Sequence, residues 1–246
     1  MIKFFRKIRQ NLLSEGKTVK YLKYAIGEII LVVIGILIAL QINNWNESKK
    51  NNKLVSNYKK GLIENLKKDS LNVSDVLFRV REDLEKIEEY EERVSKSKKP
   101  LDTIVKIARY EFNFIIALNY NFENDTYQVL NSTGHLGLFD NDLIKELNEL
   151  NNLQKKSIFA TDKSYNNYSQ VLLKYSEKYP FSFKSNLIQN GSIASDKIWN
   201  NISQTNHATE FNALVITKSD CYRLELLTLP VILEKTTKLL EKLQKK

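Results

Sequence analysis

An apolar run near the start of the chain limits its fold more than any other feature. Residues 25–42 read AIGEIILVVIGILIALQI, in which Glu28 and Gln41 are the only polar side chains. A helix over this run is roughly 27 Å long, close to the hydrocarbon thickness of a bilayer. Two tyrosines precede the run and Trp45 follows it, as aromatic residues do at membrane interfaces. We therefore expect a single transmembrane helix over residues 24–45 rather than a buried core helix.

The charges on either side of the run predict its orientation. Residues 1–24 contain seven Lys and Arg side chains, whereas residues 46–60 contain five. The positive-inside rule then places the N-terminus in the cytoplasm and residues 46–246 on the other side of the membrane. A cleavable signal peptide has the same basic-then-apolar order. The run is long for such a peptide and lacks a clear small-x-small cleavage site, which favours an uncleaved signal anchor.

The basic tail, residues 1–23, has a pattern of its own. Apolar residues recur every three to four positions in MIKFFRKIRQNLL, with basic residues between them: Lys3, Arg6, Lys7 and Arg9. This pattern predicts a short amphipathic helix that lies on an anionic membrane surface. The alternative is that the charges serve only as a topology signal.

Glu28 is the one ionisable residue inside the apolar run, where a charge is costly. At 100° per residue, Val32, Gly35 and Ala39 fall within about 40° of it on one face of the helix. The small pair Gly35-x-x-x-Ala39 lets two helices approach closely, which favours an association face with a second copy or a partner membrane protein. Two other interpretations stay open. Glu28 could respond to protons, or its carboxylate could simply reach the headgroups.

The amino-acid composition limits the possible fold classes and kinds of ligand. The chain has 7 Gly and 3 Pro in 246 residues, too few turn-forming residues for an all-β fold, and this favours long helices. One Cys excludes an internal disulfide framework and a multi-thiolate metal site, and two His argue against a His-rich metal centre, so we expect neither metal nor cofactor. The net charge of +9 lies at the two ends, with +6 in residues 1–24 and +3 in residues 234–246. The segment between them is nearly neutral, which argues against nucleic-acid binding.

Beyond the apolar run the apolar spacing is helical. Residues 46–99 carry a stripe at three- and four-residue steps, which predicts a long amphipathic helix that forms one face of a bundle or a coiled-coil seam. Further helices are expected over 101–119, from Asp125 to Leu130 with Asp125 as its cap, from a cap at Asp140 to about 178, and from about 209 to the end. Pro230 either kinks the last of these or begins a new helix. The fold class is therefore all-α: an N-terminal amphipathic helix, one transmembrane helix and an extramembrane helical bundle over residues 46–246.

Two stretches carry a family resemblance. The opening MIKFFRKIRQNLLSEGK followed by YLKYAIGEIILVVIGILIALQINNWNE, and the later TYQVLNSTGHLGLFDNDLIKELNEL, resemble the domain-of-unknown-function 6090 family of bacterial membrane proteins. The resemblance is specific over residues 1–48 and looser over 126–150. It implies a single-span membrane protein with a helical extramembrane region, but no activity and no catalytic residues. With the predicted topology, it leads us to expect a protein of the bacterial inner membrane with a periplasmic C-terminal domain.

No catalytic motif stands out. The sequence has no P-loop, GxGxxG, HExxH or GxSxG, and Cys221, His135 and His207 each fit a structural role better than a catalytic one. We therefore expect the protein to be a non-enzymatic anchor or interaction module that contacts the bilayer and other proteins. The alternative is a ligand-sensing domain that signals through a partner protein.

Overall fold

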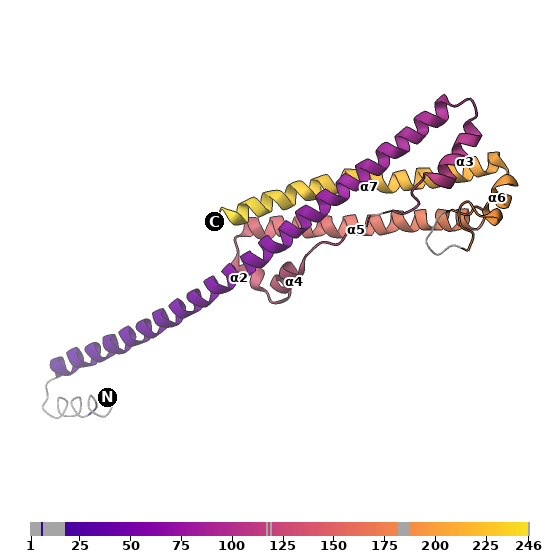
Figure 1. The fold of residues 1–246 in the computed structure, drawn as a ribbon. Helices are drawn as coiled ribbons and strands as arrows, with labels where there is room; N and C mark the ends of the chain where they lie inside the picture. Colours follow the sequence, from indigo (N-terminus) through magenta and orange to yellow (C-terminus); the bar gives the residue numbers. More distant parts are fainter. Residues whose placement is uncertain (1–5, 7–17, 117, 119, 182–186, 246) are drawn as a thin grey trace. The chain divides into compact units, whose positions relative to one another are not determined.

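The computed structural model describes residues 6, 18–116, 118, 120–181 and 187–245. The chain divides into two compact units, Met1–Asn57 and Tyr58–Lys246, which are described separately below. Every regular secondary-structure element among the described residues is a helix, as Figure 1 shows, and this confirms the all-α class.

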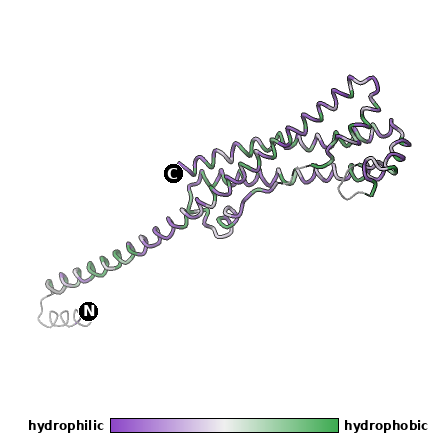
Figure 2. Tube along the Cα trace, in the orientation of Figure 1, coloured by the Kyte–Doolittle hydropathy of each residue, from purple (hydrophilic) through white to green (hydrophobic). Residues whose placement is uncertain are grey.

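Helix α2 extends over Thr18–Lys96 and contains the apolar run. It is followed by α3 (Pro100–Tyr110), α4 (Asp125–Ser132), a short 3₁₀ helix η1 (His135–Leu138), α5 (Asn141–Ser176), α6 (Ile193–Asn200) and α7 (Gln204–Gln244). The apolar run and the predicted long amphipathic helix therefore belong to one helix. Figure 2 shows the hydrophobic residues of the apolar run gathered along the N-terminal part of α2.

Local chemistry accounts for most of the helix boundaries. Pro100 occupies the first turn of α3, where its missing N–H costs nothing. Asp140 caps α5 as expected, since its carboxylate accepts a hydrogen bond from the backbone N–H of Leu143 at 2.8 Å. Asp125, by contrast, is the first helical residue of α4 rather than its cap; that position belongs to Asn124, whose side chain makes no capping bond. The turn before η1 is made by Gly134 at φ 71°, a conformation that favours glycine.

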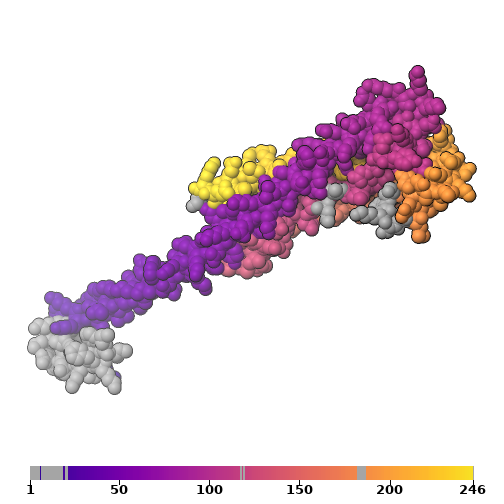
Figure 3. All heavy atoms as spheres, in the orientation of Figure 1, coloured from indigo at the N-terminus to yellow at the C-terminus, as the bar shows by residue number. Residues whose placement is uncertain are grey.

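The second unit is a bundle built on α5 and α7. These helices lie side by side and run in opposite directions in Figure 1, and two ion pairs connect them: Lys242–Glu146 (3.0 Å) and Lys235–Glu149 (3.0 Å). Lys178, just past the end of α5, pairs with Glu210 of α7 at 2.6 Å. The part of α2 within this unit crosses over both helices, as the space-filling view in Figure 3 shows. Its apolar stripe is buried there, including Leu62, Leu66, Val73, Val76, Val80 and Ile87. The stripe is therefore a face of a bundle.

The predicted helix over residues 101–119 is wrong in its second half. Helix α3 ends at Tyr110, and the described residues between 112 and 124 are not helical. Side chains at every second position point into the core here: Phe112, Phe114, Ile116, Leu118 and Phe122 are all buried. Such alternation requires an extended backbone, because a helix turns successive even positions by about 200° onto opposite sides. We call the described residues of the range 111–124, which leaves out 117 and 119, the strap.

The C-terminal part agrees with the sequence pattern in outline. The loop after α5 contains the short helix α6, which includes Ile198 and Trp199, and α7 begins at Gln204, somewhat earlier than expected. Pro230 lies inside α7 and starts no new helix. The stretch 182–186 of this loop lies outside the described residues.

Candidate functional site

The predicted association face lies in the first unit. Glu28 is half-buried, while Val32, Gly35 and Ala39 are exposed, and a side chain added at Gly35 meets nothing within 4 Å. The rest of the apolar run is exposed on all sides; Leu31, for example, keeps 64% of its surface accessible. Of the described helices, one is long and apolar enough to cross a membrane, and no residue of its most apolar window is buried. The structure places the four residues on one helix.

Most of the predicted basic tail falls outside the described part of the chain. Lys3, Lys7 and Arg9 lie outside the described residues, and Arg6 is described as an exposed residue. The amphipathic helix on a membrane surface therefore stays a prediction.

In the second unit, buried polar side chains gather along the strap and bind its backbone. An extended segment outside a sheet has carbonyl and N–H groups that need partners when they are buried. Tyr168 donates from its hydroxyl to the carbonyl of Phe114 at 2.7 Å, and Lys218 donates from Nζ to the carbonyl of Asn113 at 2.5 Å. At the start of the strap, Tyr90 donates to the carbonyl of Glu111 at 3.0 Å.

Lys218 is the most unusual of these groups. It is only 2% exposed, pairs with the carboxylate of Asp83 at 3.2 Å, and lies 5.0 Å from the ring centre of Phe112. Burial lowers the pKa of the Lys218 ammonium, while the nearby Asp83 carboxylate opposes that effect. Tyr222 also donates to Asp83, at 2.6 Å. A charge this deep in the core is tolerated because the carboxylate and a strap carbonyl both satisfy it.

Two buried carboxyl groups hold the other end of the strap. Asp69 accepts from the backbone N–H of Glu123 at 2.7 Å and from Nε2 of Gln154 at 2.9 Å, and burial raises the pKa of Asp69 to about 6. Glu225 accepts from the hydroxyl of Tyr120 at 2.8 Å and from Thr161 at 2.5 Å. Burial raises the pKa of the Glu225 carboxyl as well. Both groups therefore connect the strap to the helices of the bundle.

His207 and Cys221 are core residues. His207 is fully buried beside Phe211 and Trp199, its Nε2 lies 2.8 Å from the hydroxyl of Tyr175, and burial lowers its pKa to about 4. Cys221 is a buried free thiol, as expected. His135 contacts a residue far away in the sequence: its Nδ1 lies 2.8 Å from the hydroxyl of Tyr58. The described residues contain no group of three or more His, Cys, Asp or Glu side chains suited to a metal ion.

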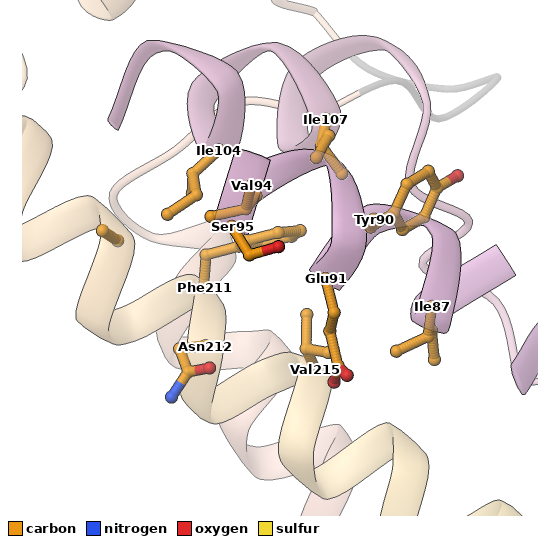
Figure 4. Close-up of a pocket in the computed structure, with 11 residues that line it drawn as sticks. Ile87, Tyr90, Glu91, Val94, Ser95, Ile104, Ile107, Phe211, Asn212 and Val215 are labelled. Carbon is orange, nitrogen blue, oxygen red and sulfur yellow. The ribbon is translucent and has the colours of Figure 1, made fainter. Parts of the chain in front are cut away.

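A groove opens where the C-terminal part of α2 meets α3 and α7. Its volume is about 260 Å³, and most of its lining is apolar: Ile87, Val94, Ile104, Ile107, Ala208, Phe211 and Val215, together with the ring of Tyr90. Figure 4 shows the apolar lining that comes from the three helices, with Val94 of α2, Ile104 of α3 and Phe211 of α7 close to one another. Glu91, Ser95 and Asn212 add polar groups to the lining, and all three are exposed.

Sequence reasoning missed the strap contacts and the groove. The polar partners are far apart in the chain, 54 residues for Asp69 with Glu123 and 105 residues for Lys218 with Asn113, so no local motif connects them. The alternation of the strap itself was visible in EFNFIIALNYNFE. Glu91 lies in an acidic run that is typical of a solvated helix surface.

The architecture defines the class: an all-helical protein with one exposed apolar helix suited to a membrane and a packed bundle. The chain belongs to a family of unknown function, DUF6090, whose family model matches residues 28–222. The match covers most of the apolar run, the strap and α5, and confirms the resemblance seen in the sequence. No curated protein and no solved structure matches the chain.

Proposed function

We propose that this protein is a non-enzymatic membrane anchor and interaction module. The observation that carries the proposal is the apolar part of α2, which exposes hydrophobic side chains on every face and is part of the same helix that enters the bundle. Such a surface is stable in lipid rather than in water. Three buried ionisable groups of the second unit support the same conclusion, because Asp69, Lys218 and Glu225 are all engaged in bonds to the strap.

Membrane insertion is tested on the full-length chain expressed in bacteria. Extraction of membranes with alkaline carbonate removes peripheral proteins and leaves inserted ones in the pellet, so the protein should stay in the pellet. Its release into the supernatant with residues 1–45 intact would contradict the proposal.

The proposed location is the bacterial inner membrane, with the N-terminus in the cytoplasm and residues 46–246 in the periplasm. The excess of basic residues before the apolar run supports this orientation. An alkaline phosphatase domain fused after Lys246 should be active, because that enzyme matures outside the cytoplasm. A β-galactosidase fusion at the same position is the matched control, and activity of that fusion alone would reverse the topology.

The proposed interaction within the membrane uses Glu28, Val32, Gly35 and Ala39. In a membrane self-association assay of the apolar helix, Gly35→Leu should reduce the signal because the larger side chain separates the two backbones. Glu28→Gln tests the contribution of the carboxylate. Gly27→Leu is the matched control, because Gly27 is also open on its Cβ side but points about 80° away from Gly35. An unchanged signal in both Gly35→Leu and Glu28→Gln would end the self-association hypothesis.

A second candidate function is ligand sensing, with a signal passed to a partner membrane protein. The groove between α2, α3 and α7 favours it, since an apolar pocket with a few polar groups is the usual form of a small-molecule site.

A further inference from the structure

The groove has the size and lining of a site for a small molecule. Its volume of about 260 Å³ exceeds the ~150 Å³ of an apolar cavity that takes up benzene. An aromatic ring with a short aliphatic chain therefore fits. The floor is formed by buried side chains of three different helices: Ile87 of α2, Ile107 of α3 and Phe211 of α7.

The charge at the groove is one-sided. Among the described residues that line the groove, Glu91 is the only ionisable acid or base apart from the Tyr90 phenol. Two cations that follow Glu91 closely in the sequence already have partners, because Arg93 pairs with Glu111 and Lys96 pairs with Glu92. The carboxylate of Glu91 forms no ion pair with another residue in the described part of the chain.

We propose that this groove binds a small hydrophobic amine. The apolar body of the ligand lies between Ile87, Phe211 and Val215, and its ammonium group binds the carboxylate of Glu91. Ser95 and Asn212 offer oxygen acceptors for the remaining ammonium hydrogens. The aromatic ring of Phe211 also favours a cation nearby, whereas the ring of Tyr90 already has the guanidinium of Arg93 5.9 Å from its centre. The inference rests on the ligand-sensing candidate and is independent of how the apolar helix associates.

The test uses the full-length protein in lipid nanodiscs and 2-phenylethylamine hydrochloride as the probe. Binding is measured by ligand-observed NMR titration, with empty nanodiscs as the background for partition into lipid. The comparison ligand is 3-phenylpropionate, which has the same ring and a chain of similar length but a negative charge. We expect saturable binding of the amine and none of the carboxylate.

Three variants locate the site. Glu91→Gln should weaken amine binding about fivefold, the effect of losing a partly exposed ion pair. Glu89→Gln is the matched control, since it removes the same charge from the same helix but lies outside the lining, and it should leave the affinity unchanged. Ser95→Trp fills the mouth of the groove from an exposed position and should abolish binding. Circular dichroism of each variant verifies that the fold is intact.

Three results would contradict amine binding at the groove. Equal binding of amine and carboxylate, unchanged affinity in Glu91→Gln, or no saturable binding of the amine would each overturn the proposal. A failure here leaves the carbonate extraction and the self-association assay untouched, because neither experiment involves the groove.

Discussion

Two segments of the second unit are buried by different physical means. The bundle part of α2, residues 58–96, is a helix whose backbone hydrogen bonds are satisfied internally, so only its apolar stripe has to find partners. The strap over residues 111–124 is extended and has no sheet partner among the described residues. Several of its backbone groups bond to side chains of the surrounding helices, including Tyr168, Lys218 and Asp69. Others bond within the strap, as the backbone N–H of Ile115 does to the side chain of Asn113.

The difference explains why the bundle contains so many buried polar residues. A helix in a bundle needs only apolar neighbours, whereas an isolated extended segment needs a donor or acceptor for each buried carbonyl and N–H group. Lys218 and Asp69 would be costly in an ordinary helical core, and here each bonds to a particular backbone atom of the strap. Stability of the strap should therefore depend on single polar atoms as well as on apolar area.

The largest expected effect comes from the apolar side of the strap. Phe114→Ala should lower the free energy of unfolding by about 3–5 kcal/mol, because the ring is buried against Phe112, Phe181 and Phe211. Ile115→Ala is the matched control, since Ile115 is 57% exposed, and its effect should stay within about 0.5 kcal/mol. Denaturant unfolding of the full-length protein in nanodiscs measures both. Similar losses for the two variants would contradict the alternating strap.

The next effect concerns the buried cation. Lys218→Met should lower the free energy of unfolding by about 3 kcal/mol, because it leaves Asp83 without its cation and the carbonyl of Asn113 without its donor. Lys163→Met removes an exposed lysine from α5 and is the control, with an expected change near zero. If Lys218→Met were as stable as the parent, the strap carbonyl would not need this partner.

The sequence predicts the features of the fold that depend on local residue patterns, and it does not predict those that depend on tertiary contacts. The apolar run and the cap at Asp140 are local signals, and the structure agrees with both: the run is helical and Asp140 caps α5. The strap was predicted as a helix because Ile115 stands among the alternating core residues and makes the stretch look uniformly apolar. The contacts of Lys218 and Asp69 depend on tertiary packing over long chain separations, which no spacing rule reaches. The association proposed for the face around Glu28 would be made with a second molecule, so neither the spacing of residues 28–39 nor the fold of one chain tests it.

A third prediction concerns how stability depends on pH through Asp69, which bonds to the backbone of the strap. Asp69 has a pKa of about 6 in the folded chain against an ordinary value of 3.8, so the folded state binds more protons between these values. Stability contributed by this group is therefore full below about pH 4 and falls as the pH rises to 6. Asp69→Asn cannot ionise, so its stability relative to the parent should increase by on the order of 2 kcal/mol between pH 4 and pH 7.

The measurement for Asp69→Asn is denaturant unfolding of variant and parent at each pH. His207 acts in the opposite direction, because its lowered pKa of about 4 destabilises the fold as the pH falls below 6.5. That contribution is common to both proteins and cancels in their difference. A difference that does not change with pH would show that the carboxyl of Asp69 titrates normally.

The smallest expected effect tests a single neutral hydrogen bond to the strap. Tyr168→Phe keeps the buried ring and removes only the hydroxyl that donates to the carbonyl of Phe114, which should lower the free energy of unfolding by about 1 kcal/mol. Tyr165→Phe is the matched control on the same helix, because Tyr165 is 46% exposed and its hydroxyl can bond to water. Hydrogen exchange resolves where the loss falls. Amides around Phe114 should exchange faster in Tyr168→Phe while those in the middle of α5 and α7 change little, because the helices keep their own backbone bonds. A uniform acceleration over strap and helices would mean that the two segments open together, and that the strap is as integral to the bundle as α2 itself.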